Sequence, residues 1–135
     1  MKRVGLVLEG GGMRALYTAG VLDAFLDHDV YIPDCFAVSA GACNAASYLP
    51  KQRTRFYHAT TRFLRDPRYM SVRNLVKSGS PFGTDFMFEE VANELEPIDY
   101  EGFAQCGGRL TVVVTNTASL GGEARYFKLN YIVFS

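Results

Sequence analysis

Apolar residues along the chain follow two spacings, one typical of buried strands and one typical of helices. Residues 4–8 and 35–38 are short apolar runs, and such runs are typical of parallel strands that are covered on both faces. Each run is followed by a helix signal, an apolar stripe over residues 13–27 and a stretch of small residues over 40–46. The order of strand, loop and helix therefore occurs twice and predicts an α/β architecture with parallel strands.

Two later segments have the composition of strands. Residues 109–116 give the strongest strand signal in the chain, because they are rich in β-branched residues and are bounded by glycines and an asparagine. Residues 123–129 alternate as a further strand, and residues 131–134 either extend it or begin another. The length of 135 residues suits one domain, so we expect residues 1–135 to form a single domain.

A third helix signal lies between these strand segments. An apolar stripe at helical spacing runs through residues 88–95, after a loop of serine, glycine and proline at 78–83. We expect Thr84 or Asp85 to cap this helix, because short polar side chains accept hydrogen bonds from the first free N–H groups. Pro97 should end it, because proline disfavours helical backbone in the residue before it.

Charge is distributed unevenly along the chain, although 14 basic and 14 acidic residues give a formal net charge of zero. Residues 51–77, the basic segment, hold eight basic residues and one acid, and residues 85–101, the acidic segment, hold seven acids and no base. The overall balance argues against a nucleic-acid-binding protein, which would carry an excess of Lys and Arg.

The basic segment has two interpretations that stay open. In the first it contacts an anionic membrane surface, with Phe56, Tyr57, Phe63 and Leu64 touching lipid. In the second it is a solvated face paired with the acidic segment, which the equal and opposite charges favour slightly. No apolar run is long enough to span a membrane, and residues 4–8 are too few for a signal-peptide core. We therefore expect a cytoplasmic protein, peripheral to the membrane under the first interpretation.

The three cysteines, Cys35, Cys43 and Cys106, are odd in number and widely spaced. They suit neither a disulfide framework nor a zinc site, so we expect reduced thiols that mostly pack in the interior, and no metal.

Three consecutive glycines, Gly10, Gly11 and Gly12, separate the first strand from the first helix. Glycine lets the backbone turn sharply, and N–H groups at the positive end of a helix dipole suit a phosphate or a developing oxyanion. The loop has neither the spacing of a dinucleotide-binding loop nor the Lys-Ser/Thr pair of a Walker loop. Taken alone, it fits an anion-binding loop and a plain strand-to-helix turn about equally.

A serine, Ser39, follows the second strand within Ala37-Val38-Ser39-Ala40-Gly41. This pattern differs by one residue from G-x-S-x-G, the nucleophile elbow, in which a strained turn exposes a serine hydroxyl at a helix N-terminus. Taken alone, an N-cap serine is the more frequent explanation of such a pattern. The pair of loops is more specific, because a nucleophile and an oxyanion loop should lie side by side at the carboxyl ends of adjacent parallel strands.

These two motifs resemble those of the patatin-like phospholipases, the bacterial members in particular. Residues 9–14, Glu-Gly-Gly-Gly-Met-Arg, resemble the family's Asp/Glu-Gly-Gly-Gly-x-Arg-Gly oxyanion motif, and residues 37–44 resemble its nucleophile elbow. The resemblance continues through the basic segment, Pro81 to Phe86 and Val113 to Asn116, to about residue 128. The chain has Ala15 and Ala37 where the family pattern has glycines.

The resemblance implies a three-layer α/β/α fold with a mainly parallel sheet, and a serine acyl hydrolase that acts on lipid or phospholipid esters without a metal or organic cofactor. Ser39 would attack the ester carbonyl, and the backbone N–H groups of the three glycines would form the oxyanion hole. Arg14 would anchor the glycine loop or lend positive charge nearby, and Gly41 would support the elbow.

The family pairs its serine with an aspartate in a downstream Asp-Gly-Gly or Asp-Gly-Ala motif, and this sequence contains no Asp-Gly pair. After Ser39 the only aspartates are Asp66, Asp85 and Asp99, and none of them follows a predicted strand. We therefore expect a truncated form with a sheet that is incomplete on its C-terminal side and whose exposed edges favour self-association. Its activity alone should be weak or absent, because a general base contributes about 10²–10⁴-fold.

Other function classes stay open. The missing Asp-Gly motif supports a non-catalytic remnant that binds an anion or a protein partner through the glycine loop and an exposed sheet edge. A nucleotide-binding α/β domain is a weaker alternative, because the Walker pair is absent and the serine elbow is present. His28 and His58 are candidates for a replacement base, and for both a structural role is favoured.

Overall fold

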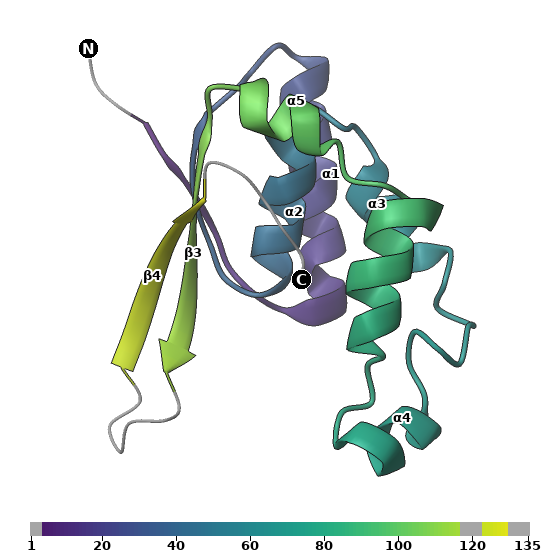
Figure 1. Cartoon of the computed structure of the whole chain (residues 1–135). Coiled ribbons are helices and arrows are strands. Elements are labelled where there is room, and N and C mark those ends of the chain that lie inside the picture. Colours follow the sequence, from purple (N-terminus) through teal and green to yellow (C-terminus); the bar gives the residue numbers. More distant parts are fainter. Residues whose placement is uncertain (1–3, 117–122, 130–135) are drawn as a thin grey trace.

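The computed structural model describes residues 4–116 and 123–129, and its framework is a four-stranded sheet. Figure 1 shows how the elements are arranged around it. The strands are β1 (Leu6–Leu8), β2 (Asp34–Ala37), β3 (Arg109–Asn116) and β4 (Glu123–Leu129), which lie in this order across the sheet. The pairs β1–β2 and β2–β3 are parallel, and β3–β4 is antiparallel. The α/β fold with parallel strands is thus confirmed, and both later strands have the predicted bounds.

The described residues contain seven helical elements besides the strands. They are η1 (Gly12–Arg14), α1 (Ala15–Asp27), α2 (Ala40–Tyr48), α3 (Arg55–Thr61), α4 (Val72–Ser78), η2 (Phe86–Leu95) and α5 (Tyr100–Gln105). The helix expected over 13–27 is confirmed, with its first turn as the separate tight turn η1. The strand expected over 4–8 is shorter, and residues 131–134 lie outside the described residues.

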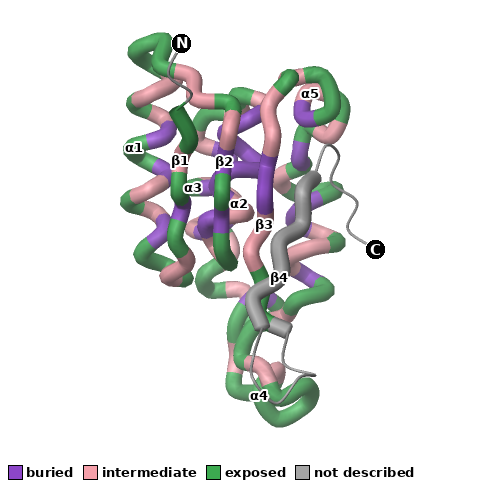
Figure 2. Tube along the Cα trace, turned by 90° about the vertical axis from the view of Figure 1, so that its left-hand side faces the viewer, coloured by how far each residue is buried: buried purple, intermediate pink, exposed green. Residues whose placement is uncertain are grey.

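The helices cover one face of the sheet (Figures 1 and 2). On that face Leu8, Ala37 and Leu110 are buried. They form one core with Tyr48 of α2 and with Leu49, the residue that follows α2. On the other face Val7 is 82% exposed. The described residues therefore form two of the three layers that the family resemblance implies. The edges of the described sheet are β1 and β4, and self-association through them stays a prediction.

The expectation about the start of the third helix is wrong. Asp85 itself has helical backbone angles, φ −61° and ψ −46°, and its side chain makes no capping hydrogen bond. The N–H of Met87 instead donates to the backbone carbonyl of Gly83 at 2.9 Å. A main-chain carbonyl, and not a capping side chain, therefore satisfies this N–H group. The helix η2 ends at Leu95, two residues before Pro97, as predicted.

The acidic segment pairs with part of the basic segment. Arg62 forms an ion pair with Glu96, and Arg68 pairs with Glu90 at 2.8 Å. This supports the solvated, paired face for these two arginines. The lipid contact of the first interpretation is wrong for one aromatic residue, Phe56, which is buried against Ala15 and Ala19 of α1 and has no exposed face to offer a membrane. Phe63 is half-buried, and its ring packs edge-on against Phe86.

One arginine of the basic segment, Arg55, is buried in the fold. Its guanidinium donates to the Glu96 carbonyl at 2.6 and 2.9 Å, to the Pro97 carbonyl at 3.3 Å and to Ser47 Oγ at 3.1 Å. Burial lowers the pKa of Arg55, but the group stays charged at neutral pH. Arg55 therefore joins α3 to α2 and satisfies carbonyl groups at the end of η2.

Replacing Arg55 by methionine should lower the free energy of unfolding by about 2–4 kcal/mol, because buried carbonyl and hydroxyl groups lose their donor. Arg53→Met is the matched control. Arg53 pairs with Asp27 on the surface, at 2.6 Å, and an exposed pair contributes about 0–1 kcal/mol. Urea unfolding measures both variants, and equal losses would contradict a bridging role for Arg55.

Candidate active site

The serine predicted as nucleophile, Ser39, lies between β2 and α2 in a strained conformation. Its backbone angles are φ 51° and ψ −126°, which non-glycine residues rarely adopt, and its side chain is exposed. Hydrogen bonds hold the turn on both sides: Gly41 N donates to the Val38 carbonyl and Ala42 N to the Ser39 carbonyl, each at 2.9 Å. The strand, the strained serine and the helix thus have the geometry of a nucleophile elbow.

Glycine at position 41 lets α2 approach the end of β1 closely. A Cβ atom built on Gly41 would lie 2.4 Å from the Leu8 carbonyl oxygen and 2.7 Å from that of Glu9. Both are backbone atoms, which cannot move aside as a flexible side chain can. At the other end of the motif, Ala37 is buried within β2 and keeps its register with Leu8 and Val112. The alanine methyl is therefore accommodated at this position without a break in the strand.

The glycine loop lies directly beside Ser39. A Cβ atom on Gly10 would lie 3.1 Å from the Ser39 Cβ and 3.8 Å from its Oγ. Gly11 and Gly12 have φ angles of 152° and 55°, which L-amino acids other than glycine rarely adopt. The structure therefore brings the two predicted loops together at the carboxyl ends of β1 and β2.

Arg14 folds back over the glycine loop at the start of α1. Its Nε and Nη2 atoms lie 3.5 and 3.7 Å from the position that a Cβ atom on Gly11 would take. Its backbone N–H donates to the Gly11 carbonyl at 3.1 Å and closes the turn. The side chain is exposed and has no hydrogen-bond partner in the part of the chain that the structure describes. Arg14 thus places a positive charge next to the loop.

A residue that sequence analysis did not single out, Asn44, ties the two motifs together. Asn44 is buried on α2, and its Nδ2 donates to the Ala15 carbonyl at the start of α1 at 3.0 Å. This bond fixes the helix that follows Ser39 against the helix that follows the glycine loop. The sequence feature that could have identified Asn44 is an amide side chain within a run of small residues. A polar group that is buried in such a run needs a hydrogen-bond partner.

The structure does not place an obvious general base beside Ser39. Within residues 4–116 and 123–129, no side chain hydrogen-bonds to the Ser39 hydroxyl. Asp66 is held by Arg68, which lowers the pKa of its carboxyl, and Asp99 accepts from Gly102 N at 2.7 Å as the cap of α5. His28 follows the end of α1, away from the glycine loop, and His58 packs beside Tyr57.

Two of the three cysteines, Cys35 and Cys43, do not offer a nucleophile either. None of the three forms a disulfide. Burial raises the pKa of the Cys43 thiol, and it raises that of Cys35 to about 12, so both stay neutral at physiological pH. In the described part of the chain, no three residues among histidine, cysteine, aspartate and glutamate gather as metal ligands.

Comparison with known proteins agrees with the α/β fold. The sequence model of the patatin-like phospholipases matches residues 6–129. The chain therefore belongs to the patatin-like phospholipase family. A curated relative is the "Uncharacterized protein YjjU" of Escherichia coli (strain K12), which is 30% identical over 98 residues. The match covers 69% of this chain and 26% of that relative, so the chain spans about a quarter of its length. No solved structure matches the chain.

Gly41→Ala should lower the free energy of unfolding by about 2–4 kcal/mol, because its methyl group would overlap two backbone carbonyls of β1. Gly20→Ala is the matched control: it lies inside α1, and a Cβ atom there would meet no atom within 4 Å. That change should raise stability by about 0.5–1 kcal/mol, since alanine favours helix over glycine. Thermal or urea unfolding measures both. Equal effects of the two substitutions would contradict the close approach of α2 to β1.

Proposed function

We propose that the chain is the nucleophile-bearing part of a serine acyl hydrolase that acts on lipid or phospholipid esters. The observation that carries the proposal is the strained, exposed Ser39 beside the glycine loop. A residue with strained backbone angles such as those of Ser39 lowers the stability of the fold by about 1–3 kcal/mol, and such residues cluster at functional sites. Membership of the patatin-like phospholipase family supports lipid esters as the substrate class.

In the proposed reaction Ser39 Oγ forms a bond to the ester carbonyl carbon. The tetrahedral oxyanion is held by the backbone N–H groups of Gly10, Gly11 and Gly12, and the cation of Arg14 stabilises the negative charge. Collapse of this intermediate breaks the ester bond, and the alcohol leaves with a proton. Water then attacks the acyl-serine and releases the fatty acid. These steps use no metal or organic cofactor.

The proton of Ser39 needs an acceptor, which the family resemblance implies is an aspartate. Asp66 and Asp99 already serve local structure through Arg68 and Gly102. We therefore propose that the dyad aspartate is neither Asp66 nor Asp99, and that this chain alone turns over slowly. Loss of a general base costs about 10²–10⁴-fold in rate.

The three unpaired thiols fit a reducing compartment, so we propose the cytoplasm as the location. Among the described residues, no helix has both the length and the apolar character needed to cross a bilayer.

A fluorophosphonate probe tests the nucleophile without needing turnover. Mass spectrometry should find the adduct on Ser39, at a rate at least about 10²-fold above that of an ordinary serine, because the oxyanion loop stabilises the attack. Ser78 is an exposed serine on α4 and serves as the matched internal control. Ser39→Ala should abolish the adduct, whereas Ser78→Ala should leave it unchanged.

No adduct on Ser39, in protein shown to be folded by circular dichroism, would reject the catalytic proposal. The second candidate would then lead: a non-catalytic protein that binds an anion or a partner at the glycine loop. The observation that favours it is the Ser39 hydroxyl, which no described side chain contacts through a hydrogen bond.

A further inference from the structure

A protruding segment at residues 70–82, the α4 finger, lies at the end of the molecule toward which β1 and β3 run (Figures 1 and 2). The loops that hold Ser39 and the three glycines are at the same end of the sheet. At the base of the finger Met70 and Phe82 form an antiparallel bridge, and Ser71 N donates to the Pro81 carbonyl at 2.9 Å. The finger is therefore a closed, structured loop.

The helix within the finger turns its apolar side outward. Val72, Leu75 and Val76 lie three and four residues apart, so they share one face of α4. They are 76%, 47% and 84% exposed, and α4 has no buried residue at all. An ordinary surface helix covers its apolar stripe with the protein core. This one leaves it uncovered in the described structure.

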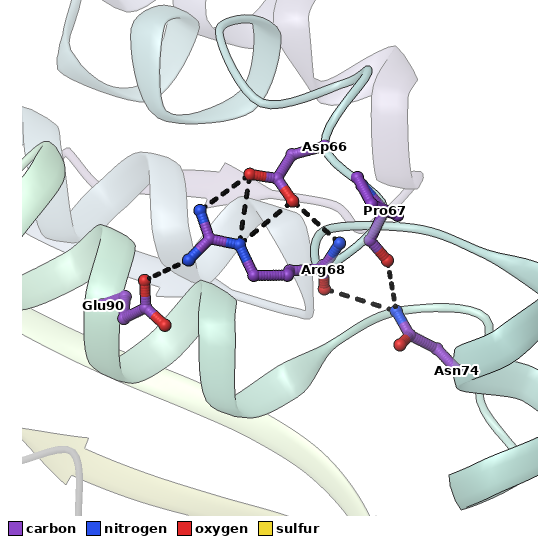
Figure 3. Close-up of polar contacts among 5 residues, drawn as sticks. All are labelled: Asp66, Pro67, Arg68, Asn74 and Glu90. Atoms are coloured by element: carbon purple, nitrogen blue, oxygen red, sulfur yellow. Dashed lines mark hydrogen bonds and ion pairs between the residues drawn. The ribbon is translucent and has the colours of Figure 1, made fainter.

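The polar side of the same helix is the side that holds it in place. Asn74 Nδ2 lies 3.3 Å from the carbonyls of Pro67, Arg68 and Pro81, and the Asn74 N–H bonds to the Ser71 hydroxyl at the helix start. Figure 3 shows Asn74 reaching the backbone of residues 67 and 68. Because these polar contacts fix the inner side of α4, they also fix its orientation, with the apolar face turned outward.

The base of the finger is anchored to the rest of the fold by ion pairs. The Arg68 guanidinium binds Asp66 and Glu90, both at 2.8 Å, and lies over the Phe86 ring at 4.3 Å (Figure 3). Tyr69, next to it, is buried against Phe86. The exposed apolar face is thus held at a fixed place relative to η2.

Two cations flank the apolar face. Arg73 and Lys77 are four residues apart, so they share one side of α4, between the apolar face and the side that carries Asn74. Neither has an ion-pair partner among the described residues, and residues 70–82 contain no acid. Arg73 and Lys77 differ in this respect from Arg62 and Arg68, which form ion pairs with glutamates of the acidic segment.

We propose that the α4 finger docks the protein on an anionic lipid surface. Val72, Leu75 and Val76 enter the boundary between headgroups and acyl chains, and Arg73 and Lys77 bind lipid phosphates. Seven residues of helix are about 10 Å long, so α4 lies in the interface and does not cross it. The choice of lipid over a protein partner rests on the proposed function, and docking at this end would hold the Ser39 loop toward the bilayer.

Sedimentation with vesicles tests the charge and apolar contributions. Vesicles of neutral phosphatidylcholine and vesicles containing about a quarter phosphatidylglycerol are compared, on a Ser39→Ala background that removes hydrolysis. Arg73→Gln with Lys77→Gln should weaken partition to anionic vesicles about 25-fold, at about fivefold per charge. Val72→Ser with Val76→Ser should weaken it about tenfold or more.

Matched controls lie at the opposite end of the sheet, beyond the ends of α1 and α2. Lys51→Gln and Val30→Ser should each change partition less than about twofold, since neither residue reaches the proposed surface. Because Val72, Arg73, Val76 and Lys77 are exposed, circular dichroism should show all variants folded. Equal losses in the finger and control variants would overturn the proposal.

A site-specific probe is available because the chain contains no tryptophan. Val76→Trp should show a blue shift of its emission with anionic vesicles, whereas Val30→Trp should show none. Binding without a shift at position 76 would overturn the finger as the docking site. No binding to either vesicle would overturn lipid as the occupant and favour a protein partner. Both results are independent of Ser39 labelling, so failure of docking and failure of the catalytic proposal are distinguishable.

Discussion

The close approach of α2 to the end of β1 is the constraint on which the site depends. Gly41 allows it, because a methyl group there would lie 2.4 Å from the Leu8 carbonyl oxygen. With α2 seated this deeply, the chain between β2 and α2 has to turn within two residues, and Ser39 takes the strained backbone. The same depth brings Ser39 against Gly10, and Asn44 then locks α2 to α1. The absence of a side chain at Gly41 thus sets the relative position of the glycine loop and the Ser39 turn.

Sequence reasoning succeeded where one local signal decides the structure. The β-branched run at 109–116 and the alternating run at 123–129 form strands with those bounds, and Ser39 lies in the expected turn. It failed where main-chain groups compete with side chains. The Gly83 carbonyl accepts from the Met87 N–H, a bond that Thr84 or Asp85 is expected to supply, because the helical backbone already includes Asp85.

Contacts that only the tertiary structure creates could not be predicted from the sequence pattern either. Arg55 resembles its basic neighbours in sequence, yet it is buried and donates to the Glu96 carbonyl at the end of η2. Val72, Leu75 and Val76 have the spacing of a core-facing helix, and only the fold leaves them exposed. The basic segment was treated as one unit, but Arg62 and Arg68 are paired, whereas Arg73 and Lys77 are not paired among the described residues.

The proposed catalysis divides into a part that the described residues assemble and a part that they do not. In the proposed reaction a strained serine, a glycine loop and a nearby arginine bind and react with the acyl carbon. A positioned base is the part that accepts the proton, and Asp66 and Asp99 are occupied elsewhere. Reactivity toward a probe and turnover of an ester therefore report on different parts of the site.

The most direct measurement is the rate at which a fluorophosphonate labels Ser39 in Gly41→Ala, compared with the unaltered chain and with Gly20→Ala. It is made under conditions where circular dichroism shows all three proteins folded. The account predicts that Gly41→Ala slows labelling by at least about tenfold, because Ser39 moves away from the glycine loop. Gly20→Ala should leave the rate unchanged. An unchanged rate in folded Gly41→Ala would contradict the claim that this close approach builds the site.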